Sequence, residues 1–369
     1  MSIKIVNNYQ NQQKQFPMKK LILSIVALMV FTVCNAQKVD LDRFYVKVTY
    51  RNLPQKPLGL DYKSFVVEPI FTSAMGKIFS TDEVKDKFTI EGFKRVEENG
   101  DIKIKFHVED IMLTRTEVKN RVEEAKDKAG KVTSRKTYYW FEIEYSMNAK
   151  ADVYNSKNQQ LLQSFNLDGR DSKYTYTLSE TSSYNGARDS YLLNKDMVIR
   201  NIISSKFEGY YSTINNFLTQ NYGYKVISEN ELVWIQNSKK HPEYEPYINI
   251  YNTMKDIFSQ MTPDLPLNQE KIQPVIDYLN GLVKKYTTNE KPDRKLRYSA
   301  FYNLGKIYLY LDMPDEVIKQ GNALITNDYD TGDGKRLIES ANKLKELFEK
   351  NKLTSPPSRH FERNLSETL

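Results

Sequence analysis

Cysteine and histidine are scarce in this chain, which has one cysteine and three histidines among 369 residues. A single cysteine excludes a disulfide framework and any zinc site built from several thiolates. The glycines are scattered, and none belongs to a phosphate-cradling G-x-x-x-x-G-K loop or a G-x-S-x-G nucleophile elbow. We therefore expect no cofactor and no recognisable catalytic motif, although the sequence alone does not decide whether the protein is an enzyme.

Long apolar runs are equally scarce, and the most extended one is Leu21–Val33. Two lysines precede this run and Ala36 follows it, which is the order of a bacterial secretory signal peptide. The run is shorter than the roughly 20 residues that a comfortable membrane span needs. We therefore interpret residues 1–36 as a leader that is cut between Ala36 and Gln37, with the true start at Met18 because its preface is polar.

The only cysteine lies at the end of this leader. Lipid attachment at Cys34 would require a small residue just before it and a leucine three positions before it, and the chain has Val33 and Phe31 there. Cleavage after Ala36 removes the cysteine altogether. We expect an exported protein, periplasmic or extracellular, with lipid anchoring through Cys34 as the alternative.

Loss of the leader also changes the charge. The leader contains four lysines and no acidic residue, so the formal net charge falls from +7 to +3. A modest positive charge on an exported chain argues against a nucleic-acid partner. No second long apolar run follows, so the mature chain is expected to have no transmembrane helix.

Residues 37–237 have the pattern of an α+β domain. The stretch "DIKIKFHVEDIMLTRTEV" alternates cleanly, and a second alternating stretch, "YYWFEIEYSMNAKADVYN", has an apolar face that starts at Phe141 and continues to Val153. Around a polar loop, two such strands predict an antiparallel hairpin. Apolar residues at three- and four-residue steps, which begin with Leu193 and Met197, predict one long helix over 189–221 with these residues on its buried stripe. We expect an N-terminal antiparallel sheet packed by this helix.

Residues 241–352 have a helical pattern instead, with five amphipathic segments joined by short connectors. Limited proteolysis is expected to cut near 237–242 and separate two domains. The last residues, 353–369, are polar and rich in serine and proline, and they are expected to form a disordered tail.

One stretch of the helical part, at about 298–325, carries a recognisable pattern. In "FYNLGKIYLYLDMPDEVIKQGNALI", Phe301, Leu304, Gly305 and Tyr308 hold the places of a Trp-Leu-Gly-Tyr signature. This stretch resembles one tetratricopeptide (TPR) repeat. The resemblance implies that Gly305 lets two helices approach closely and that the domain presents a concave surface to a peptide partner.

The resemblance is incomplete. Val317 and Leu324 replace two usual alanines, Gly321 replaces a usual aromatic residue, and the proline expected after the second helix is missing. One repeat cannot bury its own apolar face, so the flanking helices must stack on it. The N-terminal domain shows no family motif, although its strand order resembles α/β domains of small periplasmic proteins from Gram-negative bacteria.

A calcium loop is the nearest approach to a metal site in the sequence. With Asp328 as position 1 of an EF-hand, Asp330 falls at position 3 and Glu339 at position 12. Position 6 is then Asp333 where an EF-hand needs glycine. Glu339 also belongs to the next helix, so the three residues remain a weak calcium candidate and no metal site is expected.

An aromatic cluster supplies the candidate binding residues. In "TYYWFEIEY", Tyr138 and Trp140 share one strand face with Glu142 and Glu144. Exposed aromatic rings bind sugars or peptides by stacking on their apolar faces, whereas core packing would also explain these rings. The two glutamates have the chemistry of a glycosidase pair, but a solvated strand face accounts for them equally.

Two functions remain open from the sequence. The first is an exported, non-catalytic binding or assembly protein of the bacterial cell envelope, whose helical domain binds a protein or peptide partner. The second is a hydrolase that acts on an envelope or carbohydrate polymer through a dispersed active site. A groove between helices favours the first, and two acids with a histidine in a deep pocket favour the second. The oligomeric state is not indicated.

Overall fold

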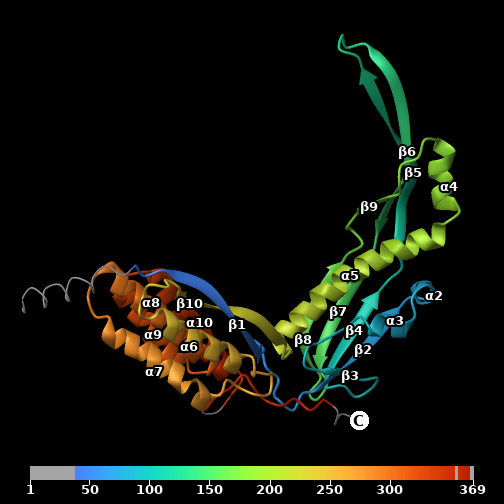
Figure 1. Cartoon of the computed structure of the whole chain (residues 1–369). Helices are drawn as coiled ribbons and strands as arrows, with labels where there is room; N and C mark the ends of the chain where they lie inside the picture. The colour runs from blue at the N-terminus through green and yellow to red at the C-terminus, as the bar shows by residue number, and fades with distance from the viewer. Residues whose placement is uncertain (1–37, 354–355, 366–369) are drawn as a thin grey trace, which may run out of the picture.

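A computed structural model describes residues 38–353 and 356–365 of the chain. The protein has two lobes, and its overall class is α+β with a sheet region followed by a helical region. We call residues 52–225 the sheet lobe, and residues 38–51 with 226–353 the helical lobe (Figure 1). The predicted cleavage site between Ala36 and Gln37, and Cys34 with it, lies outside the described residues.

The sheet lobe is built on a five-stranded mixed sheet with the order β3-β2-β4-β7-β8. The antiparallel arrangement expected from the sequence is wrong for part of this sheet, because β2 runs parallel to both β3 and β4. A parallel neighbour requires a crossover, and the short helices α2 and α3 supply it. The bounds are β2 Ser64–Phe71, β3 Lys94–Arg95, β4 Ile102–Val108, β7 Ala149–Asn155, β8 Gln160–Asp168, α2 Met75–Ile78 and α3 Thr81–Lys85.

A long hairpin, β5 Met112–Lys126 and β6 Val132–Ser146, extends away from this sheet (Figure 1). The predicted antiparallel pairing around a polar loop is confirmed, but each predicted strand is divided in two: β5 pairs with β6 here, and β4 pairs with β7 in the five-stranded sheet. Strands β5 and β6 also continue through the charged stretch that the sequence suggested was a loop. The hairpin belongs to a second, three-stranded sheet with the order β5-β6-β9. Its third strand, β9 Tyr174–Thr177, pairs only with residues 142–145 of β6. We call the β5–β6 hairpin, residues 112–146, the hairpin arm.

Helices α4 Tyr184–Leu192 and α5 Lys195–Tyr222 replace the single helix expected over 189–221. Asn194 between them has non-helical backbone angles, so the apolar stripe loses its phase there. As a result Leu193 and Met197, expected on the buried stripe, are 83% and 57% exposed. Beyond the break α5 covers the sheet as predicted, with Phe207 packing 5.6 Å from Phe106, ring centroid to ring centroid.

The alternation of β4, β6 and β7 is confirmed by burial. Ile102, Ile104 and Phe106 on one face of β4 are fully buried, whereas the lysines between them are half-buried. The apolar face that begins at Phe141 runs without a change of side to Val153, although the chain leaves one strand and enters the next on the way. Hydrophobic burial on this face fixes the register of the strands.

Strands β1 Leu41–Arg51 and β10 Val226–Gln236 form a separate two-stranded antiparallel ribbon. Val46, Val48 and Ile235 of this ribbon are buried in one cluster with Tyr247 and Met254 of the helices. The ribbon therefore belongs to the helical lobe, and the domain boundary at 237 drawn from the sequence differs from the packing. A boundary read along the chain misses a strand pair whose members lie far apart in sequence.

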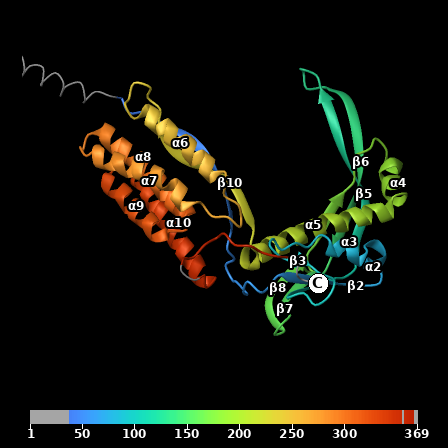
Figure 2. The ribbon, with the colours of Figure 1, turned by 60° about the horizontal axis from the view of Figure 1, so that its bottom comes forward.

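The five predicted helices of the helical lobe are confirmed, and consecutive helices lie against one another (Figure 2). Within the described residues, none of the helices combines the length and apolar character that a membrane crossing requires. The bounds are α6 Tyr244–Phe258, α7 Gln269–Lys285, α8 Lys291–Tyr310, α9 Pro314–Asn327 and α10 Thr331–Lys350.

The residues that carry the TPR resemblance lie on α8. Leu304 is fully buried in the core that joins α6, α7 and the ribbon, while Phe301 and Tyr308 are half-buried. A Cβ on Gly305 would lie 2.6 Å from a methyl carbon of Leu337 on α10. The close approach at Gly305 is therefore to α10, and the expected approach to the adjacent helix α9 is looser.

Candidate functional site

The aromatic pair Tyr138 and Trp140 lies on the outward face of the hairpin arm, and both rings are half-buried. The opposite face holds Phe141, whose ring stacks on Tyr191 of α4 at 4.4 Å between centroids. The guanidinium of Arg121 covers the ring of Tyr138 at 4.7 Å from its centroid. A cation on the ring occupies the face that a sugar or peptide would need. A binding platform at this pair stays a prediction.

The two glutamates beside this pair face cations on the neighbouring strand. Glu142 lies 3.8 Å from the ammonium of Lys119, and Glu144 lies 3.9 Å from the guanidinium of Arg115. These carboxylates therefore belong to an alternating array of surface charges. Such an array does not resemble the acid and carboxylate pair that flanks a glycosidic bond.

The weak calcium candidate does not assemble into a loop of oxygen ligands. Asp330 caps α10 and accepts hydrogen bonds from the backbone N–H groups of Gly332 and Asp333. Glu339 pairs instead with Lys343 at 2.8 Å. Within residues 38–353 and 356–365, no group of three His, Cys, Asp or Glu side chains is placed to hold a metal ion.

Two of the three histidines are buried. His241 accepts a hydrogen bond at Nδ1 from the backbone N–H of Glu243, and burial lowers the pKa of its imidazole. His360 lies 2.7 Å through Nδ1 from the carbonyl oxygen of Thr262, and burial lowers its pKa as well. His107 is half-buried on the polar face of β4, as the sequence indicated. Each histidine serves local packing, and none lies beside two acids in a deep pocket.

Glu243 has the surroundings of a structural carboxylate. It accepts hydrogen bonds from the hydroxyl groups of Tyr278 and Tyr286 at 2.9 and 3.0 Å, and from the ammonium of Lys285 at 2.5 Å. Burial alone would raise the pKa of this carboxyl, but the three donors outweigh burial and hold it below its ordinary value. A carboxylate stabilised in this way is a poor general acid.

Asp168, in the sheet lobe, is a second buried carboxylate of the same kind. Its side-chain donors are the hydroxyl groups of Tyr174 and Tyr210 at 2.7 and 2.8 Å, and the ammonium of Lys206 at 3.0 Å. The backbone N–H of Gly169 donates to the carboxylate as well, at 3.0 Å. Burial would again raise the pKa of this carboxyl, and these hydrogen bonds reverse the direction and lower it. Asp168 thus fixes the end of β8 to α5 and leaves no charge for a substrate.

The C-terminal segment, residues 356–365, corrects the disordered tail expected from the sequence. We call it the strap, because it runs from the helical lobe to the sheet lobe (Figure 2). On the helical side, Arg359 donates to Asp312, and the backbone N–H of Phe361 donates to the carbonyl of Pro263 at 3.2 Å. On the sheet side, Arg363 donates to the carbonyls of Gly92 and Tyr62 at 2.9 and 2.8 Å.

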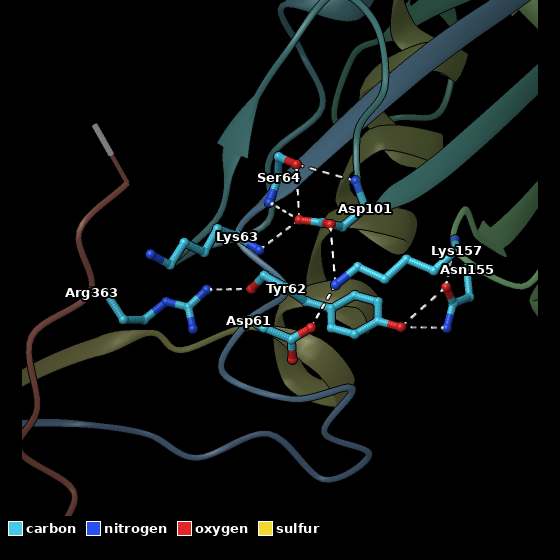
Figure 3. Close-up of polar contacts among 8 residues, drawn as sticks. All are labelled: Asp61, Tyr62, Lys63, Ser64, Asp101, Asn155, Lys157 and Arg363. Carbon is cyan, nitrogen blue, oxygen red and sulfur yellow. Dashed lines mark hydrogen bonds and ion pairs between the residues drawn. The ribbon is translucent and has the colours of Figure 1, made fainter. Parts of the chain in front are cut away.

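The sheet end of the strap meets a dense polar network (Figure 3). Asp101 accepts hydrogen bonds at Oδ2 from the backbone N–H groups of Lys63 and Ser64 and from the Ser64 hydroxyl, at 2.8, 3.0 and 2.9 Å. Lys157 pairs with Asp61 at 2.6 Å, and this hydrogen bond contributes most to raising the pKa of the lysine above its ordinary value.

This network contains a serine, a lysine and carboxylates, as hydrolase active sites do, but it lacks a base that could activate the serine. The Ser64 hydroxyl donates to a carboxylate that two backbone amides already hold, so no neutral base is positioned to take its proton. Lys157, the nearest amine, is kept charged and cannot act as a base. The network instead secures the chain ends of β2 and β4, and the strap docks against it.

A groove opens on the helical lobe where α6, α7 and the strap meet. Its volume is about 880 Å³. Ile257, Leu267 and Leu311 form an apolar part, and Leu265 at the rim is 55% exposed. Ser358 and the charged side chains of Glu270 and Lys271 also line it. Four carboxamides and three prolines contribute the rest of the surface: Gln260, Asn268, Gln269, Gln273, Pro266, Pro356 and Pro357.

Sequence reasoning missed both the strap and this groove. The Ser-Pro composition of residues 355–358 is typical of a flexible tail. The next residue, Arg359, is nevertheless fixed by Asp312, which lies 47 positions earlier in the sequence. The sequence signal that was present is the high density of arginine and aromatic residues at 359–363, which differs from the polar composition of most disordered segments.

Comparison with known proteins adds little to this description. No protein-family profile matches the chain, and no curated protein matches it. A solved structure described as a homolog of neuraminyllactose-binding hemagglutinin from Helicobacter pylori is similar at 14% identity and a TM-score of 0.20, over 44% of this chain and 96% of that one. A dodecameric PelC variant from Paraburkholderia phytofirmans is similar at 11% identity and a TM-score of 0.18, over 48% and 98%.

Proposed function

We propose that the protein is an exported, non-catalytic binding or assembly protein of the bacterial cell envelope, periplasmic or extracellular, and that its helical lobe binds a protein or peptide partner. The observation that carries this proposal is the groove between α6, α7 and the strap. It combines an apolar part with a rim of carboxamides, which suits an extended peptide that needs both side-chain burial and backbone hydrogen bonds.

The net charge of the groove limits the kinds of peptide that it can bind. Glu270 and Lys271 are the charged side chains that line it, and their charges cancel. Electrostatic attraction therefore contributes little to recognition, and shape with hydrogen bonding contributes most. A peptide segment of low net charge, with one or two apolar side chains, is the partner that this lining fits.

A binding function is also supported by the state of the acidic residues. The buried carboxylates Asp168 and Glu243 are each held by three side-chain donors and have lowered pKa values. The paired glutamates of the hairpin arm face surface cations. Neither Asp168 nor Glu243 has the raised pKa that a general acid needs near neutral pH.

The TPR-like interpretation of α8 and α9 remains part of the proposal. In it, α8 and α9 form one repeat, and α7 and α10 stack on its two sides. The groove lies mainly outside this repeat, at the connection from α6 to α7, and the repeat contributes Leu311 from the turn between α8 and α9. The partner would therefore bind at the end of the helical stack, where the strap supplies one wall.

A matched pair of variants tests this function. Leu265→Asp places a charge at the rim of the groove, and Leu161→Asp places the same charge on β8, where the leucine is 50% exposed. We expect the wild-type chain and Leu161→Asp to capture the same protein from envelope extract, and Leu265→Asp to lose it. Capture that is identical for all three chains would contradict the proposal.

A further inference from the structure

The outer edge of β5 has no neighbouring strand in the part of the chain that the structure describes. The order of this sheet is β5-β6-β9, so β5 pairs through one edge only, over its 15 residues. An unpaired edge of this length presents a row of backbone N–H and C=O groups that can accept another strand. The unpaired edge therefore predicts that a strand from another chain pairs with β5 in the functional protein.

The hairpin arm also lacks a covering layer over much of its length. Every side chain from 120 to 136 is exposed, on both faces of the two strands. A two-stranded ribbon with both faces in water is marginally stable on its own, and a further strand adds the missing support. The arm therefore gains most from a partner that contributes strands to its edge.

The charges along β5 identify the partner. Arg115, Glu117, Lys119, Arg121 and Glu123 share the outward face of the strand, as their register opposite β6 shows. Their signs in order are plus, minus, plus, plus, minus. An antiparallel copy of the same sequence, centred on Lys119, places Arg115 opposite Glu123 and Glu117 opposite Arg121. Opposite charges directly across two strands stabilise their pairing.

We propose that two copies of this chain associate through their β5 edges, as antiparallel strands related by a two-fold axis at Lys119. Each copy contributes the same edge, which is the requirement of a two-fold symmetric interface. The two arms then form a continuous four-stranded ribbon, β6-β5-β5-β6. Four pairs of opposite charge then face each other across the new strand pair, two from each half of the symmetric arrangement. In the single chain Arg121 donates to Glu180 at 2.7 and 2.8 Å, so its guanidinium turns from Glu180 to Glu117 of the second copy when the strands pair.

Neighbouring registers lack this complementarity. A centre at Asn120 places Glu117 opposite Glu123 and Lys119 opposite Arg121, so both pairs repel. A centre at Val118 places Arg115 opposite Arg121, so that one repulsive pair cancels the gain from Glu117 opposite Lys119. The charged side chains of β5 therefore favour the register centred on Lys119 over the two neighbouring registers.

The symmetric centre brings two Lys119 ammonium groups near each other. Each of them contacts Glu117 of its own strand and lies 3.8 Å from Glu142 of β6. These carboxylates offset the repulsion between the two lysines. The exposed position of the pair also lets solvent screen the remaining repulsion.

Charge reversal tests the proposal on the full exported chain by sedimentation velocity over a concentration series. The wild type is expected to form a dimer. Glu117→Arg alone and Arg121→Glu alone each make two of the four crossing pairs repulsive, and self-association should weaken at least tenfold. An equimolar mixture of the two variants recovers the dimer, because each arginine then faces a glutamate.

The double variant E117R/R121E should likewise dimerise as the wild type does, and circular dichroism with thermal unfolding checks that each variant is folded. A misfolded variant cannot regain association on mixing, so recovery separates pairing from damage. A wild type that stays monomeric over the whole series would overturn the proposal. Variants that dimerise unchanged, or a mixture that stays monomeric, would overturn it as well.

Discussion

The guanidinium of Arg359 donates to the carboxylate of Asp312, with 2.6 Å between Nε and Oδ1, and the two side chains are 9% and 3% exposed. The same guanidinium lies over the ring of Tyr50, 4.4 Å from its centroid. The backbone N–H of Arg359 donates to the second carboxylate oxygen at 2.7 Å. This buried pair fixes the strap to the helical lobe, directly beside Leu311 and Ser358, which line the groove.

Removal of one partner from this pair should be strongly destabilising. Arg359→Met keeps the length of the side chain but leaves Asp312 buried without its cation. We expect the free energy of unfolding to fall by about 3–5 kcal/mol, the usual result when one buried charge loses its partner. Urea unfolding followed by circular dichroism measures this change.

A surface pair provides the control for that measurement. Asp315 pairs with Lys345 at 2.9 Å, but its side chain is 77% exposed. Asp315→Asn should therefore change the free energy of unfolding by less than about 1 kcal/mol. Equal effects of the two substitutions would show that the strap does not hold its buried position in solution.

The strap also gives the protein a dependence on pH. Burial lowers the pKa of His360 below its ordinary value of 6.5, because the folded protein disfavours the imidazolium. The unfolded chain binds a proton as the pH falls through that value, while the folded chain resists it. The neutral imidazole of His360 therefore contributes its full share to the free energy of unfolding at pH values above 6.5. This contribution is lost as the pH falls from 6.5 toward the lowered pKa of the folded chain.

His360→Gln isolates this contribution, since His107 and His241 have pKa values lowered in the same direction and titrate in both proteins. The wild type should exceed the variant in free energy of unfolding by more at about pH 7.5 than at about pH 5.5. Urea unfolding at the two pH values gives this difference. A difference that is the same at both would mean that His360 is exposed to solvent.

Two glycines of the sheet lobe should respond in opposite ways to alanine. A Cβ on Gly100 would lie 2.5 Å from the backbone nitrogen of Val66, whereas one on Gly209 meets nothing within 4 Å. Gly100→Ala must move β2 or β4 and should lower the melting temperature. Gly209→Ala lies inside α5 and should raise stability by up to about 1 kcal/mol, because alanine favours the helix. Thermal unfolding of both variants decides, and a neutral Gly100→Ala would contradict the close packing of β2 on the loop before β4.

Processing of the leader predicts a specific mass. A chain cut after Ala36 begins at Gln37 and contains no cysteine. Intact mass spectrometry of protein isolated from the envelope should give this species. A chain that begins at a diacylated Cys34 would instead support the alternative of lipid anchoring, and an uncut chain would contradict export by a cleaved signal.

Much of the fold follows from local patterns in the sequence. Alternation identified the buried faces of β4, β6 and β7, and helical periodicity identified α6 to α10, because each pattern reflects one element packing on one core. The β1–β10 ribbon could not be predicted in the same way, since Val46 and Ile235 pack together although the whole sheet lobe separates them in the sequence. The placement of Leu193 depends on a single helix break at Asn194, which periodicity alone did not reveal.

The site was less predictable than the fold. Tyr138 and Trp140 were found from composition, but the cation over Tyr138 comes from a neighbouring strand whose register had to be known. The groove depends on the strap, and the strap depends on Arg359 reaching Asp312. Long-range ion pairs of this kind leave no periodic signal in a sequence.

The groove of the helical lobe is proposed to hold a partner in the cell envelope, and site-specific photo-crosslinking in cells tests this proposal. A photoreactive amino acid replaces Leu265 at the groove rim, and in a parallel strain it replaces the similarly exposed Leu161 on β8. After irradiation of intact cells, the account predicts a discrete crosslinked protein for the probe at 265 and not for the probe at 161. No adduct at 265, or the same adducts at both positions, would contradict it.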